Sequence, residues 1–297
     1  MLDSILFSVF PGIVNGCVYA LIGVGFIMIR KTSGVFNLAQ GQIVIFGCYI
    51  FYSFGVDMGL PVWGAILGSL VVGIILGVLV ERILMRPLYG QPIMAAVIIT
   101  LAFALFLEGI LSLGWGNEFL VAPRIFPRGV AVRMMSATIS YDQAAIIFFT
   151  VVMFAIIIYF FRKARMGIAM MAVSEDQTTS QSLGIRVARL VAVSWAVACA
   201  LGALGGILIT NISGIHYSMT EIGIKAIAVA IIGGFESFGG LLIAGILVGV
   251  CESLGIAFVD PYMSGGSVRE IVAFVLMTVI LMTKPYGLFG WEKIERV

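Results

Sequence analysis

The stretch GLPVWGAILGSLVVGIILGVLV, residues 59–80, carries no charged side chain. A helix needs roughly 20 predominantly apolar residues to cross about 30 Å of hydrocarbon, and this run is long enough. Its apolar residues are continuous rather than alternating, which favours a helix over a strand of a membrane barrel. The stretch therefore predicts a transmembrane helix.

Runs of the same kind recur along the whole chain. Hydrophobic residues occupy 61% of the 297 positions and charged residues 11%, and the mean hydropathy is +1.16, whereas soluble domains are about half apolar. The fold class predicted is an all-α integral membrane protein, a polytopic bundle of about 8–10 transmembrane helices without a second domain. The stretch 222–238, which glycines interrupt, fits one short span or a re-entrant pair. The expected spans are residues 5–29, 35–56, 59–80, 92–114, 143–161, 188–211, 222–234, 238–258 and 269–283.

Basic residues predict the orientation, because Lys and Arg that flank spans are retained in the cytoplasm. They gather in alternate loops and at the C-terminus, at Arg30, Lys31, Arg82, Arg86, Arg162, Lys163, Arg165, Arg186, Arg189, Lys284, Lys293 and Arg296. These segments are expected in the cytoplasm, opposite Arg124, Arg128, Arg133 and Arg269. The N-terminus is expected outside, without a cleaved signal peptide, because a positive n-region is missing.

Catalytic and metal chemistry are not predicted. His216 is the only histidine, so the usual zinc signatures cannot be built. No Ser-His or Cys-His set stands out, and the cysteines fit small buried apolar positions within separate spans. We therefore expect no catalytic residue, no metal and no cofactor, and the absence of a basic cluster argues against nucleic acid.

Small residues recur at helical spacing on three of the expected spans. Such residues let helix backbones approach closely, which is how bundles gain contact in lipid. We interpret them as packing positions: Gly64, Gly68, Gly73, Gly77, Ala198, Gly202, Gly206, Gly240, Ala244 and Gly249.

Polar side chains inside spans cost free energy unless they face protein or water. The candidate translocation pathway consists of a pair on the first span and a cluster at the start of the second: Asn15, Tyr19, Asn37, Gln40 and Gln42. Interhelical hydrogen bonding is the structural alternative for these residues. Glu108, Lys225 and Glu252 also fall inside spans, where they either join the pathway or extend to the membrane surface.

Two similar five-residue segments, called the echo segments below, suggest an inverted repeat. Thr32-Ser-Gly-Val-Phe36 follows the first span, and Ile212-Ser-Gly-Ile-His216 follows the sixth. An offset of five spans inverts the second copy, and inverted repeats around a midplane pathway are a recurrent transporter plan. Chance is the competing explanation for so short a match.

One surface helix is expected between the fifth and sixth spans. Ser174 can cap it, Glu175 and Asp176 suit its first turn, and Gly184 can end it. The same segment, with Ser182-Leu-Gly-Ile185, resembles the cytoplasmic coupling segment of ABC importer permeases of the branched-chain amino-acid class.

The resemblance continues in order along nearly the whole chain. It includes Asn15-Gly16 with Tyr19-Ala-Leu21, Phe36-Asn-Leu-Ala-Gln-Gly41, Gly233-Gly-Phe-Glu-Ser-Phe-Gly-Gly240 and Lys284-Pro-Tyr-Gly-Leu-Phe-Gly290. The family often has His and Glu where this chain has Gln40 and Gln42, so a role that needs ionisable groups there is not carried over.

The resemblance implies a single transmembrane permease domain over residues 1–297, in the inner (plasma) membrane of a bacterium. Its implied partners are a homologous second permease subunit, two cytoplasmic ATPase subunits and a periplasmic substrate-binding protein. The ATPase-coupling residues would be Ser174, Glu175, Asp176, Ser182, Leu183, Gly184 and Ile185. The chain lacks a Gly-x-x-x-x-Gly-Lys-Ser/Thr phosphate loop, so ATP would be hydrolysed by a partner.

Other classes of function remain open at this point. A secondary transporter for a small polar or amphipathic solute would need a coupling-ion site, which Glu108 and Glu252 are able to supply. A channel or an intramembrane enzyme leaves the coupling-like loop unexplained. Members of the resembled class carry leucine, isoleucine and valine, and relatives carry other amino acids, urea or amides, so the substrate stays open.

Overall fold

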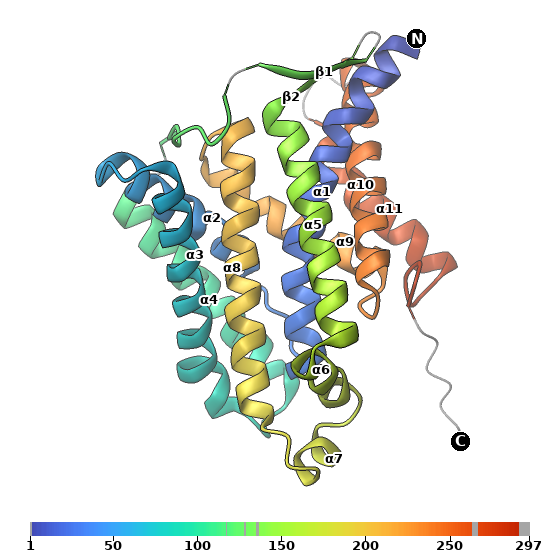
Figure 1. The fold of residues 1–297 in the computed structure, drawn as a ribbon. Coiled ribbons are helices and arrows are strands. Elements are labelled where there is room, and N and C mark those ends of the chain that lie inside the picture. Colours follow the sequence, from blue (N-terminus) through green and yellow to red (C-terminus); the bar gives the residue numbers. More distant parts are fainter. Residues whose placement is uncertain (1, 117, 128, 135–136, 263–266, 291–297) are drawn as a thin grey trace. The chain divides into compact units, whose positions relative to one another are not determined.

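The computed structural model describes the chain except residues 1, 117, 128, 135–136, 263–266 and 291–297. Three basic residues used to predict the orientation, Arg128, Lys293 and Arg296, lie outside the described residues. The described chain is built almost wholly of helices (Figure 1). Two short paired strands lie between the fourth and fifth helices.

The helices follow the apolar runs of the sequence, except for two short helices between the fifth and sixth runs. Their bounds are α1 Leu2–Ser33, α2 Gln40–Tyr52, α3 Val62–Leu79, α4 Ile93–Trp115, α5 Tyr141–Lys163, α6 Arg165–Glu175, α7 Gln177–Ser182, α8 Val187–Ser213, α9 Thr220–Gly233, α10 Phe238–Phe258 and α11 Arg269–Thr283. Strands β1 (Val130–Met134) and β2 (Ala137–Ser140) pair antiparallel between α4 and α5. The all-α polytopic fold class is confirmed.

Within the described chain, six helical stretches are long and apolar enough to cross a membrane alone. They are Ser8–Ser33, Val62–Leu88, Ile93–Trp115, Tyr141–Lys163, Val187–Ser213 and Phe238–Tyr262. The other three expected spans correspond to α2, α9 and α11, which are shorter apolar helices of 13, 14 and 15 residues. The stretch 222–238 is therefore one short helix, α9, and the turn before α10.

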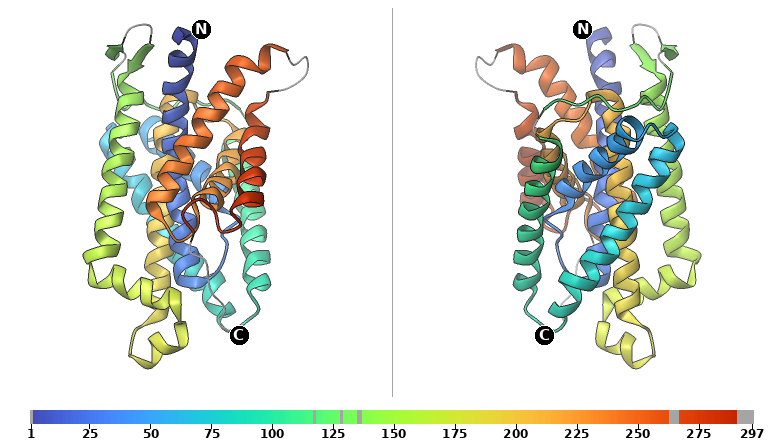
Figure 2. Two further views of the ribbon diagram at one scale, coloured as in Figure 1. Left: turned by 90° about the vertical axis from the view of Figure 1, so that its right-hand side faces the viewer. Right: turned by 90° about the vertical axis from the view of Figure 1, so that its left-hand side faces the viewer.

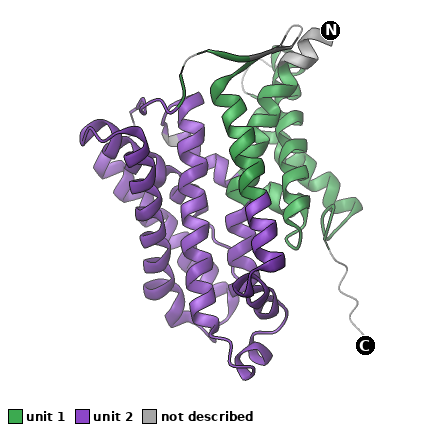
Figure 3. Ribbon diagram, viewed as in Figure 1, with its two compact units in different colours: residues 1–23, 126–154, 225–297 green, residues 24–125, 155–224 purple. Residues whose placement is uncertain are grey.

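The chain forms two compact units, each assembled from distant segments (Figure 3). Unit 1 comprises residues 1–23, 126–154 and 225–297, and unit 2 comprises residues 24–125 and 155–224. Helices α1, α5 and α9 each contribute residues to both units. The two units are described separately below.

Glycine contacts hold unit 1 together. A Cβ at Gly12 would lie 2.7 Å from the Gly249 carbonyl oxygen, and one at Gly16 would collide with Gly245, so α1 and α10 pack backbone to backbone. Helices α9 and α10 form a hairpin in which the backbones of Gly233 and Gly240 touch. The turn between them contains Gly234 at φ +83°, a conformation that favours glycine.

In unit 2, α8 packs against both α2 and α3. Gly77 of α3 lies against the backbone of Trp195, and Gly206 of α8 lies against Val44 of α2. The interpretation of Gly77 and Gly206 as packing positions is thus confirmed, whereas a Cβ at Gly64 would meet only Leu60 and Pro61 at 3.5 Å or more. At one end of this unit, α7 lies beyond the first turn of α8 (Figure 1 and Figure 2).

Candidate functional site

A buried amide pair stands at the start of α2, in unit 2. The side-chain nitrogen Nδ2 of Asn37 donates to Oε1 of Gln40 at 2.9 Å, and Nε2 of Gln40 donates to the Ala198 carbonyl oxygen of α8 at 3.2 Å. Both side chains are fully buried. Since Oδ1 of Asn37 also accepts from the Ala39 backbone N–H at 3.1 Å, this pair fixes the turn that begins α2.

Two glycines make room for the Gln40 amide. A Cβ at Gly25 of α1 would lie 2.6 Å from Nε2 of Gln40, and one at Gly202 of α8 would lie 3.0 Å from it. The buried amide therefore depends on small residues from two other helices. Gln42, two positions along α2, is half-buried.

The first turns of α2 and α9 meet. A Cβ at Gly223 would collide with the backbone of Gly41, and a Cβ at Gly41 would lie 2.6 Å from the Thr220 carbonyl oxygen. Unpaired backbone N–H groups give the start of a helix a partial positive charge. Two such ends come together here, beside Gln40.

The two echo segments adopt the same turn. Gly34 has φ +71° and its N–H donates to the Arg30 carbonyl at 2.8 Å, while Gly214 has φ +72° and donates to the Thr210 carbonyl at 2.9 Å. The following aliphatic residues, Val35 and Ile215, are both buried. In each case a long helix ends in this turn and a short helix follows, so the local match goes beyond the sequence letters.

A buried ionic network occupies unit 1. The Lys225 ammonium of α9 lies 3.2 Å from Oε1 of Glu252 on α10, and the Tyr19 hydroxyl of α1 donates to Oε2 of Glu252 at 2.8 Å. Lys225 also donates to the Arg269 carbonyl oxygen at 3.1 Å. Of the two alternatives for Lys225 and Glu252, extension to the membrane surface is excluded, because their side chains are only 6% and 1% exposed.

This network also changes the roles of other candidate residues. Tyr19 is fully buried and its hydroxyl is engaged by Glu252, while Asn15, one turn earlier, is half-buried. Two carboxylates were considered for a coupling-ion site, and one of them, Glu108, is half-buried on α4 in unit 2. The other, Glu252, already has the Lys225 ammonium and the Tyr19 hydroxyl as partners.

Sequence reasoning missed a second buried carboxylate, Glu81, in the π-helical segment Val80–Met85 that follows α3. Its side chain is 1% exposed, accepts from the Tyr89 hydroxyl at 2.8 Å and lies 3.5 Å from Nε of Arg86. The spacing of these residues, all within one loop and the helix end before it, was a usable signal for the cluster.

The expected coupling segment contains two helices instead of one. Ser174 and Glu175 lie in the last turn of α6, where the Ser174 hydroxyl donates to the Met171 carbonyl at 2.7 Å. Asp176 is the cap of α7, since its Oδ1 accepts from the N–H groups of Thr178 and Thr179 at 2.8 and 3.1 Å. The prediction that Ser174 caps the helix is wrong, because buried Met170 and Val173 extend α6 past it.

Hydrogen bonds to the Asp176 carboxylate favour its ionised form, which is the form that accepts at the start of α7. The Thr179 hydroxyl donates to its second oxygen at 2.6 Å, and together with the two backbone donors it holds the Asp176 pKa below its ordinary value. The end of the segment matches the prediction, because Gly184 has φ +83°.

The segment is fixed to unit 2 on one side and exposed on the other. Nε2 of Gln177 donates to the Thr32 carbonyl at the end of α1 at 3.1 Å, and Ser180 is buried. Ser182 and Gly184 are exposed and Ile185 is half-buried. Leu183 is 76% exposed, so an apolar side chain projects from the tip of a polar surface.

The described residues contain no group of three or more His, Cys, Asp or Glu side chains able to hold a metal ion. The cysteines are free thiols, and Cys17, Cys48 and Cys199 are buried, as expected of packing residues. The described residues offer buried amides, two carboxylates paired with cations and an exposed loop helix. These features belong to a multi-pass membrane protein.

The comparisons identify its family. The protein-family model described as branched-chain amino acid transport system / permease component matches residues 8–281, and the chain belongs to this family. It is 29% identical to the high-affinity branched-chain amino acid transport system permease protein LivH of Escherichia coli (strain K12), over 98% of this chain and 97% of that protein. The corresponding permease BraD of Pseudomonas aeruginosa is 29% identical over 96% of each chain.

One solved structure, "PsaBC from Streptococcus pneumoniae in complex with Fab", has a TM-score of 0.49 and 16% identity, covering 97% of this chain and 93% of that chain. The family membership confirms the resemblance found in the sequence and makes the chain a transport permease.

Proposed function

We propose that this chain is the membrane-spanning subunit of an ABC importer that carries branched-chain or chemically related amino acids across a bacterial inner membrane. The observation that carries this proposal is the family match, which extends over residues 8–281. Residues 1–297 act as one permease domain, with the N-terminus outside and the C-terminus in the cytoplasm. A homologous second permease completes the pathway, and a periplasmic binding protein delivers the substrate.

ATP hydrolysis is assigned to two cytoplasmic ATPase subunits, because the sequence lacks a phosphate-binding loop. The docking segment runs from Ser174 to Ile185. Its exposed apolar tip, Leu183, supports this role, since an apolar anchor surrounded by polar groups is typical of the centre of a protein interface. The anchoring of α7 to the end of α1 offers a route by which ATPase closure moves the helices.

The translocation pathway is assigned to Asn15, Tyr19, Asn37, Gln40 and Gln42. Support comes from the start of α2, where a buried amide pair stands beside two helix N-termini. Positive helix ends suit the carboxylate of an amino acid, and broken or short helices bind substrates in this way in other transporters. Because Asn37 and Gln40 are fully buried, the pathway must open by movement of α2 or α9.

The test replaces Leu183 by Asp in the full permease, co-expressed with its proposed ATPases, second permease and binding protein. Loss of ATPase co-purification and of ATP-dependent leucine uptake into proteoliposomes is expected, at unchanged permease abundance. Met58→Asp is the matched control, because Met58 is also an exposed apolar loop residue of unit 2 but lies outside the docking segment.

Two outcomes would contradict the proposal. Normal co-purification of Leu183→Asp with the ATPase would show that docking occurs elsewhere. Leucine uptake by the purified chain in liposomes without any ATPase would instead identify a secondary transporter.

A further inference from the structure

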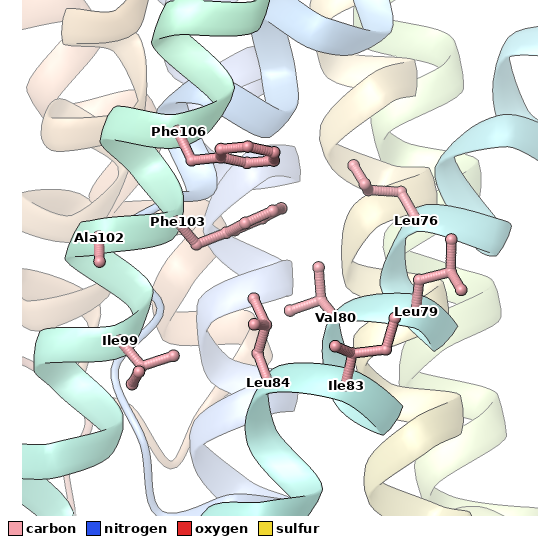
Figure 4. A pocket seen from close by; sticks show the side chains of 9 residues that line it. All are labelled: Leu76, Leu79, Val80, Ile83, Leu84, Ile99, Ala102, Phe103 and Phe106. Atoms are coloured by element: carbon pink, nitrogen blue, oxygen red, sulfur yellow. The ribbon is translucent and has the colours of Figure 1, made fainter.

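An apolar groove opens on the surface of unit 2, between the end of α3 and α4. Its volume is about 390 Å³, and nine side chains line it, all of them apolar (Figure 4). The rings of Phe103 and Phe106 extend from α4 toward the side that carries Leu76 and Val80. Val80 and Phe103 form a buried floor, while Ile83 and Phe106 are 63% and 62% exposed at the rim.

The dimensions of the groove match one leaflet of a bilayer. Its lining extends from Leu76 to Leu84 on one side and from Ile99 to Phe106 on the other. At 1.5 Å per residue these stretches are about 10 to 12 Å long, against about 15 Å for half of the hydrocarbon thickness. Both helices are spanning helices whose surfaces are mostly unburied in this chain. An extended acyl chain is therefore an occupant of the right length.

Cationic groups stand at the loop end of this groove. Within residues 76–106, all of which the structure describes, the charged residues are Glu81, Arg82 and Arg86. Glu81 is buried and engaged by Arg86 and Tyr89, whereas Arg82 is exposed and has no hydrogen-bond or ion-pair partner among the described residues. The exposed charge beside the groove is therefore positive.

The spacing places this charge next to the apolar lining. Arg82 directly precedes the groove residue Ile83, and Arg86 is two positions beyond the groove residue Leu84. Both arginines therefore lie at the loop end of the lining, where the helix leaves the hydrocarbon. Basic pockets between transmembrane helices recognise anionic lipid headgroups in this way.

We propose that this groove binds an anionic glycerophospholipid, with one acyl chain along Val80 and Phe103 and the phosphate on Arg82. An apolar groove alone would fit any hydrophobic partner. The adjoining free guanidinium selects an amphiphile that carries a negative charge at one end of a hydrocarbon chain.

The experiment measures lipid labelling of the purified full chain in phosphatidylcholine nanodiscs. The probes are phosphatidylglycerol and phosphatidylcholine that each carry a photoactivatable diazirine in an acyl chain, and mass spectrometry quantifies adducts on residues 76–106. The wild-type chain should prefer the anionic probe. Arg82→Gln should reduce this preference roughly fivefold, the factor that corresponds to about 1 kcal/mol per basic residue near the membrane surface, and Arg82→Lys should retain most of it.

Matched variants separate the site from general effects. Ala102→Trp fills the groove and should lower labelling by both probes, whereas Leu101→Trp, on an exposed position outside the lining, should not. Arg162→Gln removes an exposed arginine at the end of α5 and should leave the preference unchanged.

Two results would overturn the proposal. The first is equal labelling of residues 76–106 by the two probes, with no effect of Arg82→Gln. The second is a crosslink from Ala102→Cys to a second permease chain in the assembled importer, since the groove would then be a subunit interface.

Discussion

Removal of the Lys225 ammonium should strongly destabilise unit 1. The Lys225–Glu252 distance of 3.2 Å corresponds to an attraction of about 5 kcal/mol at an effective dielectric constant of roughly 20, before the desolvation of both groups is subtracted. Lys225→Met removes the ammonium that lies against the buried Glu252 carboxylate and leaves the Tyr19 hydroxyl as a hydrogen-bond donor to it. Removal of one partner of a buried pair costs about 3 to 5 kcal/mol. This corresponds to a decrease of two to three and a half orders of magnitude in the ratio of folded to unfolded protein.

The assay is unfolding of purified protein in mixed detergent micelles with increasing SDS, followed by tryptophan fluorescence. Lys225→Met should unfold at clearly lower SDS, and the double variant Lys225→Met/Glu252→Leu should recover most of the loss, because it removes the unpaired charge. Lys163→Met, at the exposed end of α5, is the control and should resemble the wild type.

The reasoning fails if the double variant is as unstable as the sum of its single variants. Independent effects of that kind would mean that Lys225 and Glu252 do not interact in the membrane.

Three further predictions concern unit 2. Gly223→Ala should place a methyl group against the Gly41 backbone, costing about 1 to 3 kcal/mol and lowering transport, as uptake per permease molecule will show; normal uptake would refute the close contact. Gln40→Leu should strand the buried Asn37 amide at a cost of about 1 to 3 kcal/mol, and should lower uptake more than abundance if the pair lines the pathway. Asp176→Ala should speed hydrogen exchange across residues 177–182 more than Asp176→Asn does. Because the pKa of folded Asp176 is lowered, the cap is complete above the unfolded value of about 3.9 and is lost only as pH falls through the folded pKa. After correction for intrinsic rates, hydrogen exchange of residues 177–182 should therefore not vary near neutral pH, and a variation there would contradict the assignment of Asp176 as the cap.

The helices could be predicted because hydrophobic length is a local property of the sequence. The run 59–80 and its counterparts each contain the information for one helix, and the structure places apolar helices at all nine expected spans. The end of the docking segment at Gly184 was also predictable, because glycine commonly ends a helix. Positive φ at Gly184 agrees with that prediction.

The pairing of buried polar groups was not predictable in the same way. Tyr19 and Glu252 are at opposite ends of the chain, and only the packing of α1 on α10 brings their side chains together. The boundary at Asp176 was missed for a related reason. Ser174 and Asp176 are both good caps, and the burial of Val173 by the rest of unit 2 selects the later one.

The hairpin of α9 and α10 has a consequence for how the protein is made. A lysine near the centre of a transmembrane helix costs about 2.5 to 3.5 kcal/mol to insert, and α9 has only 14 residues to offset that cost. Lys225 emerges from the ribosome before Glu252, its neutralising partner. Only residues 234–237 separate α9 from α10. The two helices are therefore able to enter the bilayer as a hairpin in which Lys225 and Glu252 are already paired. Insertion of α9 and α10 as one two-helix unit would spare the bilayer an unpaired Lys225 ammonium.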